Sequence, residues 1–304
     1  MRKSVFITGG SGLLALNWAV AVRDRYHVIL GLHKRNASLE GVQSMHVALG
    51  SASDFGAALE RVNPQIVIHT AGLTDVSACE RNPGLVYAAN VELAENVARA
   101  CFKADLPFVH ISTDHLFAGD QALLDESHPV SPLNVYGRTK AEAEIRVLKE
   151  HPQALVVRTN FYGWGTTYRH SFSDFIIEAL RGGKELTLFT DIFYTPILIE
   201  DLVFAVHELI DRSVHGIFNI AGNDRISKYE FGFLLAEEFS LDARRISEGL
   251  LANHNSDVKR PLDMSLSNKK IYNLLGRKFG GVKEQLARLH QQEKQGLSLE
   301  LKKL

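Results

Sequence analysis

The chain has 304 residues, of which 45% are hydrophobic and 23% are charged, and its formal net charge is -1. This balance is that of a globular protein with a sizeable core, and it excludes a fibrous or intrinsically disordered chain. A near-neutral charge gives no general attraction to nucleic acid or to an anionic membrane, so neither is expected as a partner.

Short apolar runs alternate with helical patterns through the first half of the chain. Strands are predicted at residues 4–8, 27–32, 44–48, 66–70, 107–112 and 155–159. Apolar residues at helical spacing cover residues 13–25, 54–62, 85–104 and 135–150. Strands that alternate with helices are typical of βαβ units, so the pattern predicts an α/β fold with a Rossmann-like, doubly wound parallel sheet.

The pattern loosens after residue 160. Helices are predicted at residues 173–181, 199–210, 228–239, 268–275 and 282–292, with a strand at 216–220. We therefore predict an NAD(P)-binding domain over residues 1–160, to which later segments can return, and a smaller, mainly substrate-binding lobe over residues 161–304. The polar tail at 296–304 is expected to be peripheral.

The chain carries no signal for secretion or for metal binding. Cys79 and Cys101 fall inside predicted helices, where a cysteine usually behaves as a small buried hydrophobe, so a disulfide is not expected. No apolar run is long enough for a signal peptide or a membrane span, and the histidines and cysteines show no metal-ligand spacing. A cytoplasmic protein without a metal is the expectation.

The first predicted strand runs into Gly9-Gly10-Ser11-Gly12, and a helix follows. A tight turn between a strand and a helix N-terminus binds a pyrophosphate through backbone N–H groups, and glycine lets the backbone approach the phosphate closely. A glycine-rich turn alone is weak evidence, but this one stands at the first βα junction. The residues predicted to contact a dinucleotide here are Gly9, Ser11, Gly12, Leu13 and Leu14.

The end of the second predicted strand bears on the choice of cofactor. An acidic residue at this position binds the ribose 2′-hydroxyl of NAD, whereas a basic residue accepts the 2′-phosphate of NADP. This chain has His33, Lys34 and Arg35 and no carboxylate. We therefore predict NADPH, with NADH still open, and a solvated basic loop is the alternative interpretation.

Tyr136 and Lys140 lie four residues apart on a predicted helix, so their side chains share one face. The strand before that helix ends in Ser112-Thr113-Asp114. A nearby ammonium lowers the pKa of a tyrosine, so Lys140 is expected to make Tyr136 a better proton donor and acceptor. Thr113 would bind a substrate carbonyl while Tyr136 supplies the proton for its reduction. These three residues are the predicted catalytic group.

These motifs resemble the extended short-chain dehydrogenase/reductases, and more narrowly the dTDP-4-dehydrorhamnose reductase group of nucleotide-sugar reductases. The similar segments are residues 8–15, 70–80, 111–117, 132–140, 158–161, 195–202 and 260–263. The resemblance implies NADPH-dependent reduction of a 4-keto-6-deoxy sugar on a nucleoside diphosphate. It also implies a homodimer through the helices at 85–104 and 135–150.

Further candidate residues follow from the same motifs. Additional cofactor contacts are expected at Ala71, Gly72, Asn90 and Asn160, besides Tyr136 and Lys140. Substrate contacts are expected at Thr74, Asp114, His115, Phe161, Arg169 and Arg260. The two arginines are diphosphate candidates because guanidinium groups match phosphate oxygens. His115 replaces a Tyr and Phe161 a Trp that the reductases often carry, so the sugar can differ from the rhamnose precursor.

Sister reactions are only partly separated by the sequence. A 4,6-dehydratase needs a Glu where this chain has His115, and the epimerase/reductases that resemble fucose synthase carry a Cys where it has Asp114. A 4-epimerase uses the same Thr, Tyr and Lys and stays open. So does a non-catalytic NADP-binding regulator like the β subunit of methionine adenosyltransferase, although the intact triad favours an enzyme.

Overall fold

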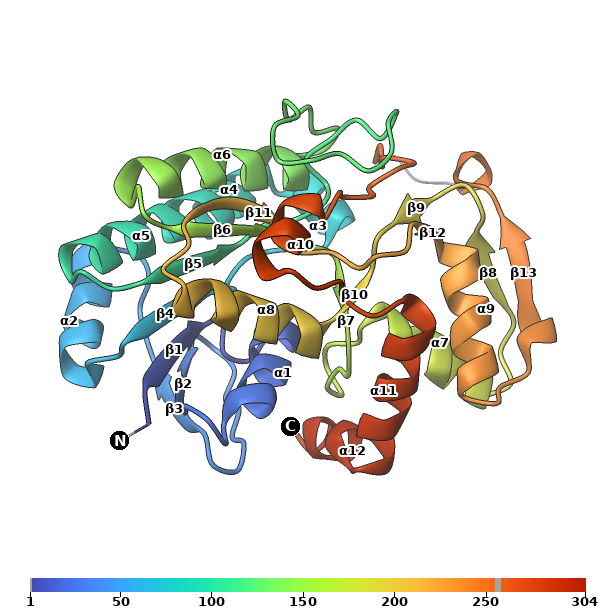
Figure 1. Cartoon of the computed structure of the whole chain (residues 1–304), viewed down its shortest axis with the longest axis horizontal. Coiled ribbons are helices and arrows are strands. Elements are labelled where there is room, and N and C mark those ends of the chain that lie inside the picture. Colours follow the sequence, from blue (N-terminus) through green and yellow to red (C-terminus); the bar gives the residue numbers. More distant parts are fainter. Residues whose placement is uncertain (1, 255–257) are drawn as a thin grey trace.

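A seven-stranded parallel sheet forms the centre of the computed structural model, which describes residues 2–254 and 258–304 (Figure 1). The strand order is β11-β6-β5-β4-β1-β2-β3, and every neighbouring pair is parallel. The strands are β1 (Ser4–Thr8), β2 (His27–Leu32), β3 (Gln43–His46), β4 (Ile66–His69), β5 (Phe108–Ile111), β6 (Leu155–Arg158) and β11 (Gly216–Asn219). The chain reverses its direction of winding between β1 and β4, and such a switch point opens a crevice at the carboxyl ends of the strands. The predicted Rossmann-like fold is confirmed.

Both faces of the sheet are apolar, and helices cover each of them. Alternate residues of a strand point to opposite faces, so Val5 and Ile7 join one hydrophobic cluster and Phe6 joins the other. On the first face lie α1 (Leu13–Val22) and α8 (Ile199–Asp211), and on the second lie α2 (Ala52–Val62), α5 (Leu93–Lys103) and α6 (Val135–Glu150) (Figure 1).

The segment between β4 and α5 is broken into several turns rather than the single helix predicted at 85–104. It comprises α3 (Val76–Arg81), α4 (Pro83–Tyr87) and a π-helical turn (Ala88–Glu92) that continues into α5. A π-helical turn changes the direction in which its side chains point. Here it carries the buried Asn90 toward the loop that follows β4.

The C-terminal lobe is built from short strand pairs and helices (Figure 1). Its strand pairs are β7 (Phe161–Tyr162) with β10 (Ile197–Leu198), β8 (Leu186–Phe189) with β13 (Ile246–Gly249), and β9 (Phe193–Tyr194) with β12 (Ile226–Ser227). Its helices are α7 (Phe172–Arg181), α9 (Lys228–Glu238), α10 (Lys269–Leu275) and α11 (Val282–Lys294), with 3-10 turns at Ala243–Arg245 and Leu251–Asn253. Capping boxes start α7 at Ser171 and α9 at Ser227.

Two elements after residue 160 belong to the central layers rather than to this lobe. β11 extends the sheet beside β6, and α8 packs on α1. The chain therefore crosses between the two parts more than once, which brings loops of the C-terminal lobe over the carboxyl ends of the strands.

The prediction that the tail at 296–304 is peripheral is wrong. This segment forms α12 (Leu297–Lys302), and its Leu301 side chain is fully buried in the cluster below the first face of the sheet. Glu300 forms an ion pair with Arg23, and Lys302 Nζ lies 2.7 Å from Glu178 Oε1. The leucines at helical spacing, rather than the polar residues between them, decide where the tail lies.

Both cysteines are free and buried, as predicted. Burial raises the pKa of the Cys79 and Cys101 thiols, so neither has the character of a reactive thiolate. Within residues 2–254 and 258–304, no helix has the length and apolarity required to cross a membrane.

Candidate active site

The turn after β1 has the shape that close approach of a ligand to its backbone requires. Gly9 adopts a φ of +68°, and a Cβ there would lie 2.8 Å from the Cα of Ala71 at the end of β4. Gly12 caps α1 without any side-chain hydrogen bond, so the first N–H groups of that helix have no side-chain acceptor at the cap. This cradle fits an anionic group such as a pyrophosphate.

One of the basic residues after β2, Arg35, is linked to the same turn through Tyr168. His33, Lys34 and Arg35 are exposed. The guanidinium carbon of Arg35 lies 3.8 Å from the centre of the Tyr168 ring, and the Tyr168 hydroxyl donates to the backbone oxygen of Ser11 at 3.0 Å. Positive charge is therefore held beside the phosphate-binding turn.

Thr113 and Tyr136 meet where β5 ends and α6 begins. Asn134 caps α6 by accepting a hydrogen bond from the Gly137 N–H at 2.9 Å, which sets the first turn of the helix. Tyr136 is buried, and the Thr113 side chain lies close enough to its hydroxyl to act on its pKa. Burial raises the pKa of the Tyr136 hydroxyl, and the bond to Thr113 lowers it by less. Burial therefore makes the Tyr136 phenolate less accessible than that of a free tyrosine, which is already protonated at neutral pH.

Lys140 lies one turn further along α6 and is fixed by groups of β5. Its Nζ donates to the Ile111 carbonyl at 2.6 Å and lies 3.2 Å from His110 Nε2. Burial lowers the pKa of Lys140 to about 8, while the charge of Glu144 acts in the opposite direction. The sequence interpretation expected Lys140 to lower the pKa of Tyr136, but the structure is different: burial dominates at Tyr136, and the amino group is bonded to the strand.

His69 and His110, on the neighbouring strands β4 and β5, are both buried. Their rings stack at 5.5 Å, and His69 Nδ1 is 2.8 Å from Thr8 Oγ1. Burial is the main cause that lowers the pKa of both histidines, to about 3 at His69, so both are neutral. His110 Nε2 can therefore accept a hydrogen bond from Lys140. Strand alternation could have shown that His110 meets Lys140, because residue 110 faces the side of the sheet that is covered by the helix carrying Lys140.

Asn90 holds the loop that follows Gly72. Its side-chain oxygen accepts from the Leu73 N–H at 2.7 Å, and its amide donates to the Leu73 carbonyl at 3.0 Å and to Thr139 at 3.1 Å. A Cβ on Gly72 would lie 3.0 Å from the Asn90 side-chain oxygen. The role that this geometry supports for Asn90 is positioning Ala71–Leu73 beside the turn.

A cavity of about 360 Å³ opens next to Tyr136, between the sheet and the C-terminal lobe. His115 packs edge-on against Tyr136, with ring centres 5.5 Å apart. Asn160 donates to the carboxylate of Asp114, which is itself buried. The cavity is lined by His115, Asn160, Phe172, Phe175, Thr187, Leu188, Phe189, Ile192, Lys228, His254, Arg260, Pro261 and Met264. Apolar walls with a few polar groups are typical of a small-molecule site.

Two cations face this cavity. Arg260 donates to Ser77 at 3.2 Å, and its buried Nε has no hydrogen-bond partner within the described chain. The sequence interpretation missed Lys228, whose Nζ lies 3.3 Å from the centre of the Tyr194 ring. Burial lowers the pKa of Lys228 to about 8, although the charge of Asp114 opposes this. Lys228 opens α9, and only the tertiary fold reveals that it reaches the cavity.

The remaining predicted substrate residues lie in different places. Arg169 donates to Thr74, in the loop that follows β4. Phe161 lies on β7, packs against the large hydrophobic cluster and is not among the cavity-lining residues. The aromatic walls are instead Phe172, Phe175 and Phe189.

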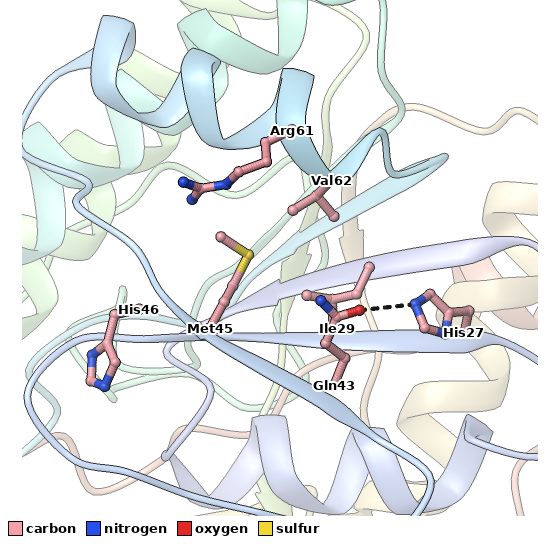
Figure 2. Close-up of a pocket in the computed structure, with 7 residues that line it drawn as sticks. All are labelled: His27, Ile29, Gln43, Met45, His46, Arg61 and Val62. Carbon is pink, nitrogen blue, oxygen red and sulfur yellow. Dashed lines mark hydrogen bonds between the residues drawn. The ribbon is translucent and has the colours of Figure 1, made fainter.

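A second hollow of about 480 Å³ lies elsewhere, against β2, β3 and the end of α2 (Figure 2). His27 and Gln43 hydrogen-bond across its floor at 3.2 Å, and Arg61 reaches over it from α2 (Figure 2). None of its lining residues belongs to the predicted site.

The parallel sheet, the glycine turn and the Tyr136–Lys140 pair together define an extended short-chain dehydrogenase/reductase fold. The model of the RmlD substrate binding domain family matches residues 1–295, so the chain belongs to that family.

Several characterised or solved proteins are similar to this chain. The probable low-salt glycan biosynthesis reductase Agl14 of Haloferax volcanii is 28% identical over 288 residues, covering 93% of this chain and 96% of that protein. A dTDP-4-dehydrorhamnose reductase of Mycobacterium tuberculosis is 30% identical over 225 residues, covering 70% and 73%. The crystal structure of a dTDP-4-dehydrorhamnose reductase from Bacillus anthracis in complex with NADP has a TM-score of 0.85 at 24% identity, covering 96% and 100%.

Proposed function

We propose that this chain is an NADPH-dependent reductase of a nucleoside-diphosphate-linked 4-keto-6-deoxy sugar. The observation that carries the proposal is the position of Tyr136, whose ring packs against His115 in the wall of a cavity that Lys228 and Arg260 also line. The names of the relatives support the same class of substrate, because two of those described above are reductases of glycan or dTDP-sugar biosynthesis.

The residues around the crevice fit a dinucleotide. The Gly9–Gly12 turn and the start of α1 would hold the pyrophosphate, since a side chain at Gly9 would clash with Ala71. Lys140 and Tyr136 would contact the nicotinamide riboside end, and Arg35 the adenosine end. NADPH supplies a hydride to the ketone carbon when it is bound.

Residues of the protein supply the proton that the carbonyl oxygen of the substrate receives. Tyr136 Oη carries a proton at neutral pH, as a tyrosine with a pKa of about 10 or above does, and holds it until a carbonyl oxygen develops negative charge. It then gives that proton to the oxygen, while the Thr113 hydroxyl orients the carbonyl and then bonds the phenolate left on Tyr136. Lys140 holds positive charge nearby, anchored to the Ile111 carbonyl.

The two cations that line the cavity are expected to orient a nucleotide sugar by binding its diphosphate. Burial is the main cause that lowers the pKa of His115; the charge of Asp114 opposes it, and those of Lys228 and Arg260 lower the pKa further. Both cations line the same cavity as His115, whose ring packs against Tyr136. Two cations this close to a catalytic tyrosine suit a substrate with an anionic diphosphate.

The test is turnover of NADPH with a panel of 4-keto sugar nucleotides, for the natural chain and for Tyr136→Phe. The variant is expected to lose about 10²–10⁴-fold in kcat and to keep its affinity for NADPH. Tyr87→Phe is the matched control, because Tyr87 is partly exposed on α4 away from the crevice. Normal turnover in Tyr136→Phe would refute the mechanism.

The same assay separates the other candidate functions. A 4-epimerase interconverts sugar nucleotides with bound NAD and consumes no NADPH. A regulatory subunit binds NADPH and turns over none of the panel. Net oxidation of NADPH, matched by formation of a reduced sugar nucleotide, is the outcome expected here.

Two further properties belong to this proposal. We infer a homodimer formed by α5 and α6, where Phe102 and Ile145 expose 55% and 60% of their surface. Sedimentation equilibrium is expected to give twice the chain mass, and a monomer at all concentrations would contradict this. We also place the protein in the cytoplasm, which cell fractionation tests.

A further inference from the structure

Tyr168 joins two segments that lie far apart in the sequence. Its ring stacks on the Arg35 guanidinium at 3.8 Å, and its hydroxyl bonds to the backbone oxygen of Ser11 at 3.0 Å. Arg35 follows β2, Ser11 belongs to the phosphate-binding turn, and Tyr168 comes from the loop between β7 and α7. A residue outside the predicted cofactor domain therefore touches both of the parts expected to bind the dinucleotide's phosphates.

The loop that carries Tyr168 is tied down on both sides. The Thr166 N–H donates to the Arg169 carbonyl at 2.9 Å, and Gly165 donates to the buried carboxylate of Asp174 at 2.6 Å. Arg169 reaches across to Thr74 on the opposite loop. Tyr168 thus sits in a closed turn with a fixed base, so its ring is a preorganised support rather than a mobile surface group.

Arg35 is left with donors to spare. It is exposed and stacks on the Tyr168 ring, and no carboxylate pairs with it among the residues the structure describes. Stacking uses the flat face of a guanidinium and leaves the N–H groups at its edge free to bind an anion. Those N–H groups match the oxygens of a phosphate, and Tyr168 holds them beside Ser11.

We propose that Tyr168 is a cofactor-specificity residue, which holds Arg35 beside Ser11 so that its guanidinium binds the phosphate on the adenosine ribose of NADPH. This inference rests on the proposed function, because it names what selects the cofactor at the same site. It assigns the choice between NADPH and NADH partly to the C-terminal lobe. The loop at residues 165–170 then contacts both the cofactor site, through Tyr168, and the loop after β4, through the bond from Arg169 to Thr74.

The experiment measures binding by calorimetry, without any sugar substrate. The two probes are adenosine 2′,5′-bisphosphate and adenosine 5′-monophosphate, which differ by the phosphate in question. Tyr168→Ala is expected to weaken the bisphosphate about two- to fivefold, and Arg35→Ala about tenfold or more, with 5′-monophosphate binding unchanged in both. Tyr168→Phe keeps the ring and should keep most of the preference. Tyr272→Ala, which removes another partly exposed ring near a cation, is the matched control.

The double variant separates a specificity role from a structural one. If Tyr168 acts through Arg35, adding Tyr168→Ala to Arg35→Ala costs no further bisphosphate affinity. Additive losses, or equal weakening of both probes by Tyr168→Ala, would overturn the inference. If the natural chain binds both probes with this preference but reduces no keto sugar, the proposed function fails and the inference stands. If it binds neither probe, both fail.

Discussion

The buried ion pair between Arg158 and Glu144 lies next to the predicted catalytic residues. It tests how much this pair stabilises the elements that carry the site. Arg158 Nη2 donates to Glu144 Oε2 at 2.7 Å and Arg158 Nε to Oε1 at 3.0 Å, and each side chain is only 4% exposed. Ser112 also donates to Glu144, at 2.5 Å. These three residues connect β6, α6 and the end of β5, the elements that position Thr113 and Lys140.

The change Glu144→Gln keeps the shape of the side chain and removes its charge. Removing one partner of a buried pair costs about 3–5 kcal/mol, because the other charge stays buried without compensation. The glutamine oxygen retains one acceptor for Arg158, so we expect the lower end, about 3 kcal/mol of unfolding free energy. With an unfolding entropy of about 2.1 cal/mol/K per residue, this lowers the Tm by about 5 °C for a chain of 304 residues. Denaturant titration and calorimetry measure both quantities.

The control is an exposed pair on the same helix. Glu142 accepts from Arg146 at 2.7 Å, but their side chains are 35% and 36% exposed, so Glu142→Gln should cost less than about 1 kcal/mol. Equal losses in the two variants would show that burial of the Arg158–Glu144 pair does not set its importance, and the reasoning would be wrong.

Two further predictions concern the cations of the site. Burial lowers the pKa of Lys140 to about 8, and the charge of Glu144 acts in the opposite direction. We therefore expect kcat to fall as the pH rises through about 8, and we expect this fall to move to lower pH in Glu144→Gln. A pH–rate profile without such a fall contradicts the assignment. Lys228→Met should raise KM for the nucleotide sugar about tenfold without weakening NADPH, because it removes a cation that lines only the substrate cavity. Lys270→Met, which removes a lysine held over Phe218 outside the cavity, is its control, and an unchanged KM in Lys228→Met excludes Lys228 from the substrate site.

The sequence was sufficient where the signal is local. Short apolar runs between helical patterns predicted all seven strands of the sheet, six of them before residue 160 and the later one at 216–220 that becomes β11. The glycines of the turn, and the four-residue spacing of Tyr136 and Lys140, depend on backbone conformation and helix geometry. Both are properties of neighbouring residues, so both could be read without the fold.

The tertiary structure decided everything that depends on contacts between distant segments. Periodicity cannot show that Tyr168 stacks on Arg35, that His110 meets Lys140, or that Lys228 faces the cavity. Periodicity also misplaced the tail. A few leucines among charged residues do not show which surface they pack against, and the structure places α12 against α11.

Burial changed the chemistry as well as the positions. From the sequence, Lys140 was expected to lower the pKa of Tyr136, but desolvation raises it and also lowers that of Lys140. The residue types that can transfer a proton follow from the sequence by itself. Their proton affinities follow only from the surrounding packed side chains, because the cost of burying a charge depends on what surrounds it.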